Sequence, residues 1–206
     1  PKDNRLLMKI ADVRCKESLY SAVGRYDFDR IIHAAALKCV DTLEANPMEA
    51  IWTNVNGTKN VLDLAGGMFN ETRVILTSTD KAVSPINTYG HTKALAEKLV
   101  LQEPGNVVCR YGNVLGSRGS VVPAFINSLL SNASINITDP EMTRFWLTID
   151  QAASLVIRHL FSNEAGGLAI PHVKASTVYD VGVAIAKILG LDRKSTRLNS
   201  SHLVIS

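Results

Sequence analysis

The chain has 206 residues, of which 46% are hydrophobic and 20% are charged, a balance typical of a soluble globular protein with one domain. The net charge of +3, without a basic run, gives no indication of a nucleic-acid partner. The 3 cysteines lack CxxC spacing and no apolar run reaches the roughly 18 residues of a membrane span, so we expect a cytoplasmic protein with no metal, no disulfide scaffold and no membrane partner.

Buried strands are predicted at four apolar runs that alternate with helical patterns. These runs span residues 5–13, 29–36, 72–79 and 106–112. Segments with the 3.6-residue spacing of helices lie at 49–65, 87–102, 121–131, 150–162 and 176–190. Strands that alternate with helices in this order predict an α/β fold, in which helices cover a doubly wound parallel sheet.

Small, polar or charged residues follow the carboxyl end of each predicted strand. They are Asp12, Val13, Ala34, Lys38, Ser78, Thr79, Asp80, Lys81 and Asn113. Ligands of an open parallel sheet bind where these ends of the strands meet, so we expect an active site there. Alternatively, all these residues could lie in solvated loops without a function, and Asp12 could simply cap the next helix.

Tyr89 and Lys93 lie four residues apart in the predicted helix 87–102 and would share one face of it. An ammonium group beside a phenol favours the phenolate, which suits a base that takes a proton from an alcohol losing hydride. A surface pair without a role is the alternative, and the YxxxK spacing alone does not decide between them.

Other candidate residues also have a structural alternative. Asp80 and Lys81 are catalytic groups, or a helix-cap aspartate beside a solvated lysine. Asn54 could orient the base or a water, or simply occupy a helix interior. Arg118 and Arg144 could hold a diphosphate, or form surface ion pairs.

Both ends of the sequence are predicted to be incomplete. A doubly wound nucleotide-binding sheet normally starts with a strand and a Gly-rich phosphate turn, and no such turn precedes the first predicted strand. The Ser-rich stretch 193–206 breaks the helical pattern before it and is predicted to be a non-native tail. We therefore expect one dinucleotide-binding domain over residues 1–192, incomplete at both ends, and weak cofactor binding by the chain as written.

A combination of motifs resembles the extended short-chain dehydrogenase/reductase family, and within it the polysaccharide-biosynthesis branch with its inverting UDP-N-acetylglucosamine 4,6-dehydratases. The motifs are "ADVR" (11–14), "HAAALK" (33–38), "EANPMEAIWTNVNGTKNV" (44–61), "TSTDKAVSPINTYGHTK" (77–93), "RYGNVLGSRGSVVP" (110–123) and "ITDPEMTRFW" (137–146). The resemblance implies an N-terminally truncated Rossmann-like fold with a partial C-terminal substrate-binding region. It also implies NADP as cofactor, with NAD possible, a UDP-sugar substrate, and a homo-oligomer at full length.

The resemblance further implies roles for individual residues. Cofactor contacts are expected from Asp12, Val13, Ala34, Lys38, Tyr89, Lys93, Val114, Leu115, Gly116, Ser117 and Arg118. Substrate contacts are expected from Lys38, Asn113, Val121, Thr138 and Arg144. The implied catalytic set is Thr79, Asp80, Lys81, Tyr89 and Lys93.

In the implied reaction, Tyr89 with Lys93 beside it takes the proton of the sugar 4-hydroxyl while C4 is oxidised. Lys81 then removes the C5 proton, and Asp80 protonates the departing 6-hydroxyl. Two alternatives remain at this point. A UDP-sugar 4-epimerase on the same scaffold would leave Asp80 and Lys81 as bystanders, and a nucleotide-binding relative would have no catalytic role.

Overall fold

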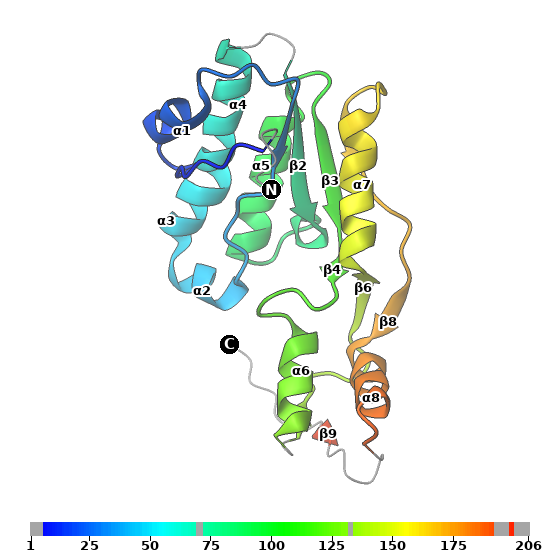
Figure 1. Cartoon of the computed structure of the whole chain (residues 1–206). Coiled ribbons are helices and arrows are strands. Elements are labelled where there is room, and N and C mark those ends of the chain that lie inside the picture. Colours follow the sequence, from blue (N-terminus) through cyan, green and yellow to red (C-terminus); the bar gives the residue numbers. More distant parts are fainter. Residues whose placement is uncertain (1–5, 69–71, 132–133, 192–197, 200–206) are drawn as a thin grey trace. The chain divides into compact units, whose positions relative to one another are not determined.

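The computed structural model describes residues 6–68, 72–131, 134–191 and 198–199 (Figure 1). Contacts between Cα atoms divide the chain into two compact units. Unit 1 comprises Pro1–Arg110 and Ser154–Pro171, and unit 2 comprises Tyr111–Ala153 and His172–Ser206. Each unit therefore contains two segments that are distant in sequence.

A four-stranded sheet forms the centre of unit 1, in the order β1-β2-β3-β7. Its strands are β1 (Arg30–His33), β2 (Arg73–Thr79), β3 (Val107–Tyr111) and β7 (Gly167–Ala169). β1 pairs with β2 and β3 pairs with β7 in parallel. The strands predicted at 29–36, 72–79 and 106–112 are thereby confirmed, and the buried centre of β2 is apolar on both faces, as in other parallel sheets.

Helices α4 and α5 cover one face of this sheet. The helical elements of unit 1 are α1 (Lys16–Val23), α2 (Val40–Ala45), α3 (Pro47–Ala50), a π-helix (Ile51–Asn56), α4 (Gly57–Met68), a 3-10 turn (Asp80–Ala82) and α5 (Thr88–Val100). Val74 of β2 packs among residues of α1 and α4, whereas Leu76 packs against Ala96 and Val100 of α5. Val74 and Leu76 lie two residues apart on β2, so their side chains point to the same face of the sheet, which α4 and α5 cover.

Two arginines on the other face of the sheet bind the end of α7 (Ile149–Phe161), a helix that runs from unit 2 into unit 1. Arg30 and Arg73 are register partners on β1 and β2. Arg30 Nε donates to the carbonyl of Leu160 at 3.2 Å, and Arg73 donates to the carbonyls of Ser162 at 2.6 Å and Glu164 at 3.0 Å. Since the last carbonyls of a helix lack partners within it, Arg30 satisfies one of them, at Leu160, while Arg73 binds the segment that follows α7.

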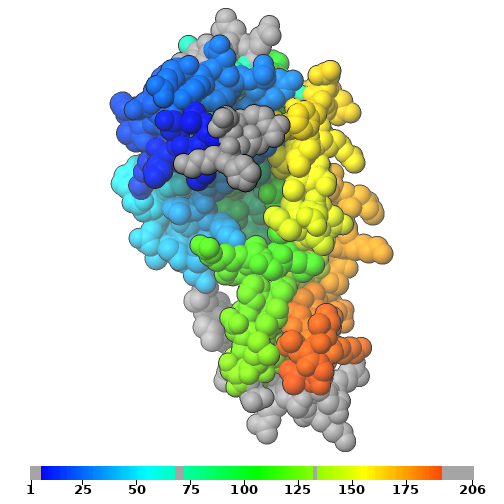
Figure 2. Space-filling view, in the orientation of Figure 1, coloured from blue at the N-terminus to red at the C-terminus, as the bar shows by residue number. Residues whose placement is uncertain are grey.

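The prediction of a buried strand at residues 5–13 is wrong. Residues 6–12 have no regular structure and lie at the surface (Figure 2). Leu6, Met8 and Ile10 are 71%, 84% and 100% exposed. An apolar run becomes a strand only where a neighbouring strand binds its amides and carbonyls, and none of the described segments pairs with this one.

Unit 2 consists of a small mixed sheet and two packed helices. β4 (Asn113–Val114) pairs in parallel with β6 (Thr143–Leu147), which pairs antiparallel with β8 (Ala175–Thr177). Helices α6 (Val121–Leu130) and α8 (Val178–Ile188) pack around a core that includes Phe125, Leu129, Ile135 and Ile185. These two helices, together with α7, confirm the helices predicted near 121–131, 150–162 and 176–190.

The predicted non-native tail, residues 193–206, lies mostly outside the described residues. Its described part is β9 (Leu198–Asn199), which pairs in parallel with β5 (Ile135–Asn136) of unit 2. This pairing concerns only those two residues, so the origin of the tail stays a prediction.

Candidate active site

Three predicted catalytic residues follow one another where β2 ends. Thr79 is the last residue of β2, and Asp80 and Lys81 begin the 3-10 turn. Asp80 Oδ1 accepts a hydrogen bond from Thr79 Oγ1 at 3.0 Å and forms an ion pair with Lys81 Nζ at 3.1 Å. The carboxylate of Asp80 and the ammonium group of Lys81 are therefore in direct contact.

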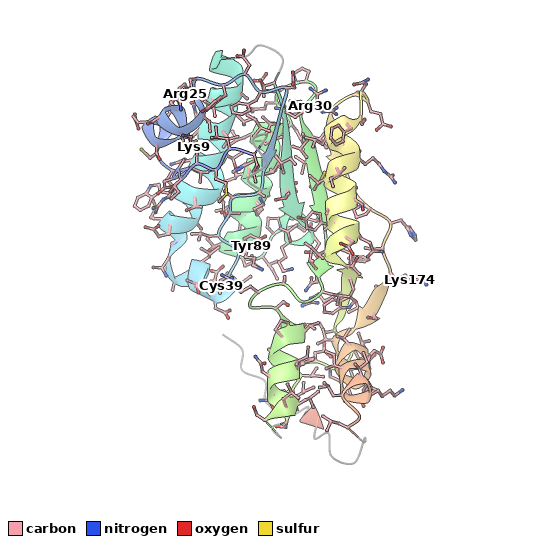
Figure 3. All side chains as sticks on the ribbon, viewed as in Figure 1. Lys9, Arg25, Arg30, Cys39, Tyr89 and Lys174 are labelled. Carbon is pink, nitrogen blue, oxygen red and sulfur yellow. The ribbon has the colours of Figure 1, made fainter. Side chains whose placement is uncertain are left out.

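The start of α5 packs directly against this turn. Asn87 caps the helix by accepting a hydrogen bond from the amide of Gly90 at 2.8 Å. A Cβ atom at Gly90 would collide with the carbonyl oxygen of Lys81, so only glycine permits this approach. Tyr89, which Figure 3 shows near the beginning of α5, precedes this point of contact. The structure thus brings the Tyr89 helix and the Lys81 turn together.

Lys93 is buried on the face of α5 that meets the sheet. It is 3% exposed, and its Nζ donates to the carbonyl of Thr77 at 2.8 Å. Burial lowers the pKa of Lys93 to about 8, and the nearby Glu97 carboxylate opposes that change. At neutral pH the side chain is thus mostly a cation, four residues along the helix from Tyr89, where it can favour a phenolate.

Asn54 fastens the loop after β1 to helix α5. This side chain, 1% exposed in the π-helix, accepts from the amide of Leu37 at 2.8 Å and donates to the carbonyl of Leu37 at 2.9 Å. It also donates to Thr92 Oγ1 of α5 at 3.1 Å. Because Ala34 and Lys38 belong to this loop, Asn54 fixes the backbone that carries two predicted binding residues.

His33 at the end of β1 is buried and neutral. Its Nε2 lies 3.0 Å from Thr58 Oγ1, and the Thr58 hydroxyl donates to the carbonyl of Asn54 at 2.6 Å. The hydroxyl hydrogen is thereby committed, so Nε2 carries the proton of the imidazole and donates it to Thr58. Burial, with a smaller effect from the charge of Lys93, lowers the pKa of His33 to about 4.

Stability is expected to decrease as the pH falls from about 6.5 to about 4, because in this window the unfolded chain protonates His33 and the folded chain does not. The contribution of His33 lost across the window is about 3 kcal/mol. Urea unfolding at pH 7 and pH 5 would measure the part of this loss above pH 5, about 2 kcal/mol. His33→Gln, which keeps a donor for Thr58, should show a weaker pH dependence than the unsubstituted chain, and equal dependence would contradict the assignment.

A hollow of about 330 Å³ in unit 1 contains the predicted adenine contact. It is lined by Asp12, Arg14, Cys15, Trp52 and Asn56. The Asp12 carboxylate accepts hydrogen bonds from the side chain and the amide of Arg14, which lower its pKa. An exposed indole beside a carboxylate acceptor matches a flat base that carries an amino group. This part of the chain therefore fits the adenine end of a dinucleotide.

The four predicted substrate residues of unit 2 line a single pocket of about 220 Å³. They are Asn113, Val121, Thr138 and Arg144. The Asn113 Oδ1 atom is buried without a hydrogen-bond partner in the described chain, so it can accept a bond from a ligand. The predicted cofactor residues Val114, Leu115, Gly116, Ser117 and Arg118 also belong to unit 2, where they form the end of β4 and the loop after it.

Glu97, Ser78 and Arg110 form a buried polar network that the sequence reasoning missed. The Glu97 carboxylate, 3% exposed, accepts from Ser78 Oγ at 2.6 Å and from Arg110 Nε at 3.0 Å, and forms an ion pair with the same guanidinium. A signal was present in the sequence, since Glu97 follows Lys93 by the same four residues that separate Lys93 from Tyr89. Tyr89, Lys93 and Glu97 therefore share one face of α5.

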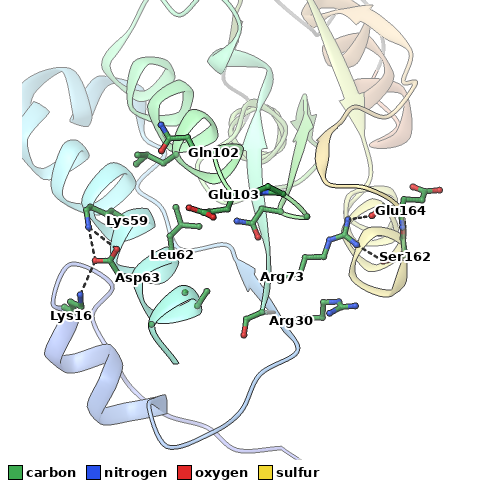
Figure 4. Close-up of a pocket in the computed structure, with 18 of the residues that line it drawn as sticks. Lys16, Arg30, Lys59, Leu62, Asp63, Arg73, Gln102, Glu103, Ser162 and Glu164 are labelled. Atoms are coloured by element: carbon green, nitrogen blue, oxygen red, sulfur yellow. Dashed lines mark hydrogen bonds and ion pairs between the residues drawn. The ribbon is translucent and has the colours of Figure 1, made fainter. Parts of the chain in front are cut away.

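A larger hollow of about 1010 Å³ lies at the amino ends of the strands, away from these residues (Figure 4). None of the predicted site residues lines it. Lys16 and Lys59 in its wall both bind Asp63, and Arg73 binds backbone carbonyls, so these cations are already engaged. The predicted catalytic residues at the end of β2 lie instead at the opposite, carboxyl end of that strand.

The described parts of the chain contain no group of His, Cys, Asp and Glu residues that could hold a metal ion. Within the same ranges, no helix is long and apolar enough to cross a membrane. Cys15, Cys39 and Cys109 are free thiols, and only Cys109 is buried.

Residues 2–203 match the family model described as polysaccharide biosynthesis protein. A curated relative, UDP-glucose 4-epimerase of Rickettsia prowazekii (strain Madrid E), is 42% identical over 209 residues, which cover 97% of this chain and 60% of the relative. The crystal structure of Pen from Bacillus thuringiensis is 34% identical, with a TM-score of 0.79, over 90% of this chain and 59% of that one. DesIV from Streptomyces venezuelae, a dTDP-glucose 4,6-dehydratase with NAD and TYD bound, is 22% identical with a TM-score of 0.81.

The match to DesIV covers 97% of this chain and 69% of that one, and it shows a common fold. The Rossmann-like parallel sheet with flanking helices that the sequence predicts is therefore confirmed. The chain spans about 60% of the length of the curated relatives it matches. The relatives include proteins named for epimerisation and for dehydration, so names alone do not choose between these reactions.

Proposed function

This chain belongs to the polysaccharide-biosynthesis branch of the extended short-chain dehydrogenase/reductase family, and from this premise we propose that it is part of an NADP-dependent UDP-N-acetylglucosamine 4,6-dehydratase of glycan biosynthesis. The observation that carries the proposal is the contact between Lys81 Nζ and Asp80 Oδ1 at the end of β2. The loss of water from a sugar requires a base and an acid at neighbouring positions, beyond the oxidation of its 4-hydroxyl, and these two groups can supply them.

The residues of unit 1 fit a nicotinamide dinucleotide in this proposal. Asp12 and the hollow beside Trp52 would hold the adenine, and Tyr89 and Lys93 would contact the nicotinamide ribose. When bound, a nicotinamide dinucleotide would supply the hydride chemistry, namely removal of hydride at C4 of the sugar and its return at C6. DesIV is described with NAD, which supports a nicotinamide dinucleotide, and NADP is the specific form that we propose.

The first proton transfer falls to Tyr89. Its phenolate takes the proton of the 4-hydroxyl as C4 is oxidised, and the buried cation of Lys93 on the same helix face favours that phenolate. The resulting 4-ketone acidifies the hydrogen on C5. A second base is then needed for C5, because Tyr89 already holds the proton of the hydroxyl.

Lys81 and Asp80 supply the second base and its acid. This step requires Lys81 as a neutral amine and Asp80, whose Oδ1 lies 3.1 Å from Lys81 Nζ, as a carboxylic acid. The amine removes the C5 proton, and the electron pair of that bond forms the C5–C6 double bond. The C6–O bond breaks, and the departing oxygen takes the proton of Asp80 and leaves as water. C5 then regains one proton from solvent as hydride returns to C6, which completes the 6-deoxy-4-keto sugar.

The pocket of unit 2 would hold the nucleotide part of the substrate. Arg144 in its wall carries the planar guanidinium that suits a diphosphate, and Asn113 Oδ1 is available to a hydrogen-bond donor. Val121 and Thr138 line the same pocket and complete the proposed set.

A UDP-sugar 4-epimerase is the second candidate, favoured by the name of the curated relatives. Inversion at C4 needs hydride removal and return at one carbon and no proton from C5. This reaction would use Tyr89 and Lys93, and the Asp80–Lys81 contact would take no part in the chemistry. The contact is therefore the feature on which the two candidates differ.

Product analysis distinguishes the two candidates. We expect the whole product of the gene, supplied with UDP-N-acetylglucosamine and NADP, to form a 6-deoxy-4-keto sugar visible by NMR. Tyr89→Phe, which keeps the ring and removes the base, should lose this product by on the order of 10²–10⁴-fold. Formation of the C4 epimer alone would reject the dehydratase and support the epimerase.

A further inference from the structure

Glu97 occupies a position where a charge is costly to keep. The residue is 3% exposed, and its carboxylate accepts hydrogen bonds from one hydroxyl and one guanidinium group. A buried ion pair is often no more stabilising than well-packed apolar side chains of similar volume. Stability alone therefore does not account for a glutamate in this place, and its partners indicate what else it does.

The partners of Glu97 connect three elements of unit 1. Glu97 belongs to α5, Ser78 to β2 and Arg110 to β3. Ser78 immediately precedes Thr79, Asp80 and Lys81, whereas Glu97 lies one helical turn beyond Lys93. A single carboxylate thus joins the helix that carries one pair of proposed catalytic residues to the strand that carries the other pair.

Two further contacts join the same two segments. Lys93 Nζ binds the carbonyl of Thr77 at 2.8 Å, and Gly90 packs against the carbonyl of Lys81. Helix α5 is therefore attached to β2 and the turn after it by three contacts. The Ser78–Glu97 bond is the one in which two buried side chains meet.

We propose that Glu97 is a positioning residue of the active site, which sets helix α5 at the height on β2 where the groups of Tyr89 and Lys93 meet those of Asp80 and Lys81. This inference rests on the proposed dehydratase reaction, in which C4 oxidation uses α5 and C5 deprotonation uses the turn. If α5 shifted along β2, a substrate held at Tyr89 would lie beyond the hydrogen-bond reach of Lys81, so C5 deprotonation would slow more than C4 oxidation.

Ser78→Ala is the variant that tests the proposal with the least damage, since it removes one hydrogen bond and leaves the Glu97–Arg110 pair intact. Ser78→Thr keeps the hydroxyl and serves as the conservative rescue. Thr72→Val is the matched control, because it removes a hydroxyl bond to the carbonyl of Phe28 at 2.7 Å, next to the opposite end of β2. Glu97→Gln is a further variant, which leaves Arg110 without its counter-ion.

The first measurement is the kinetic isotope effect with substrate deuterated at C5. Ser78→Ala should slow turnover on the order of tenfold and raise this isotope effect, because C5 deprotonation becomes rate-limiting. Ser78→Thr and Thr72→Val should keep the original isotope effect. A loss of folded protein alone lowers the rate without changing an isotope effect, so an unchanged value in both Ser78→Ala and Glu97→Gln would overturn the proposal.

The second measurement does not depend on the reaction. The amide of Lys81 is bound to Thr79 Oγ1 at 3.3 Å, so its hydrogen exchange reports on the turn. Exchange of this amide should be faster in Ser78→Ala than in Thr72→Val, and equal rates would overturn the proposal. An unsubstituted protein that forms no 6-deoxy-4-keto sugar would refute the dehydratase, while the exchange rates would still decide whether Glu97 holds the helix to the turn.

Discussion

Replacing Lys81 by alanine is expected to slow dehydration on the order of 10²–10⁴-fold, because the base for the C5 proton is lost. Tyr89 and Lys93 remain on α5, so oxidation at C4 should continue. In D₂O, substrate recovered from Lys81→Ala should contain no deuterium at C5. Asp80→Asn should behave differently, since the C5 proton can still leave and return while the 6-hydroxyl lacks its proton donor, so deuterium should accumulate without loss of water.

Lys81→Arg provides the control for the ion pair. Arginine keeps a cation beside Asp80, whose Oδ1 lies 3.1 Å from Lys81 Nζ, but it stays protonated and cannot act as the base. It should therefore be as slow as Lys81→Ala and equally free of deuterium at C5. Deuterium in either Lys81 variant at the level of Asp80→Asn would show that another group is the base.

Arg110→Met is expected to destabilise unit 1 by about 3–5 kcal/mol, because it leaves the carboxylate of Glu97 buried without its cation. The side chains of this pair are 18% and 4% exposed, so water cannot replace the guanidinium. Methionine keeps a similar unbranched volume, which limits the loss of packing. The free energy of unfolding in urea would measure the effect.

Two further variants separate this cause from others. Glu97→Gln combined with Arg110→Met removes both charges and should recover much of the stability that Arg110→Met loses. Lys59→Met breaks an exposed pair with Asp63, in which the side chains are 61% and 30% exposed, and should cost less than about 1 kcal/mol. A loss in Arg110→Met no larger than in Lys59→Met would contradict the importance of the buried pair.

The elements that sequence reasoning predicted correctly are those whose pattern is decided locally. The apolar run of β2 indicates a strand and the periodicity of α5 indicates a helix whatever their surroundings in the fold. Both elements were therefore predicted within a few residues. Residues 5–13 have an equally apolar pattern, but a strand also needs a neighbour, and pairing is not visible in a single run of residues. Helix α1 was missed because Cys15 at its N-cap makes no side-chain cap bond that would mark the start.

The candidate site shows the same limit. Thr79, Asp80 and Lys81 are adjacent in sequence, so their proximity needed no tertiary information. Asn113 and Arg144 share a pocket only because β4 pairs with β6, and their grouping came from the family resemblance rather than from spacing. The division of residues 111–153 and 172–206 into a separate compact unit likewise depends on contacts between distant segments.

The π-helix that contains Asn54 also bears on how sequences of this kind can be aligned and altered. A π-helical turn is equivalent to an α-helix into which one residue has been inserted. Deletion of one residue between Ile51 and Asn54 would convert the wide turn into an α-helix and leave α3 and α4 in place, because the wide turn already absorbs the extra residue. The wide turn from which the Asn54 amide meets both backbone groups of Leu37 would then be lost. A homologue that is one residue shorter here is therefore expected to fasten its loop after β1 with a different side chain.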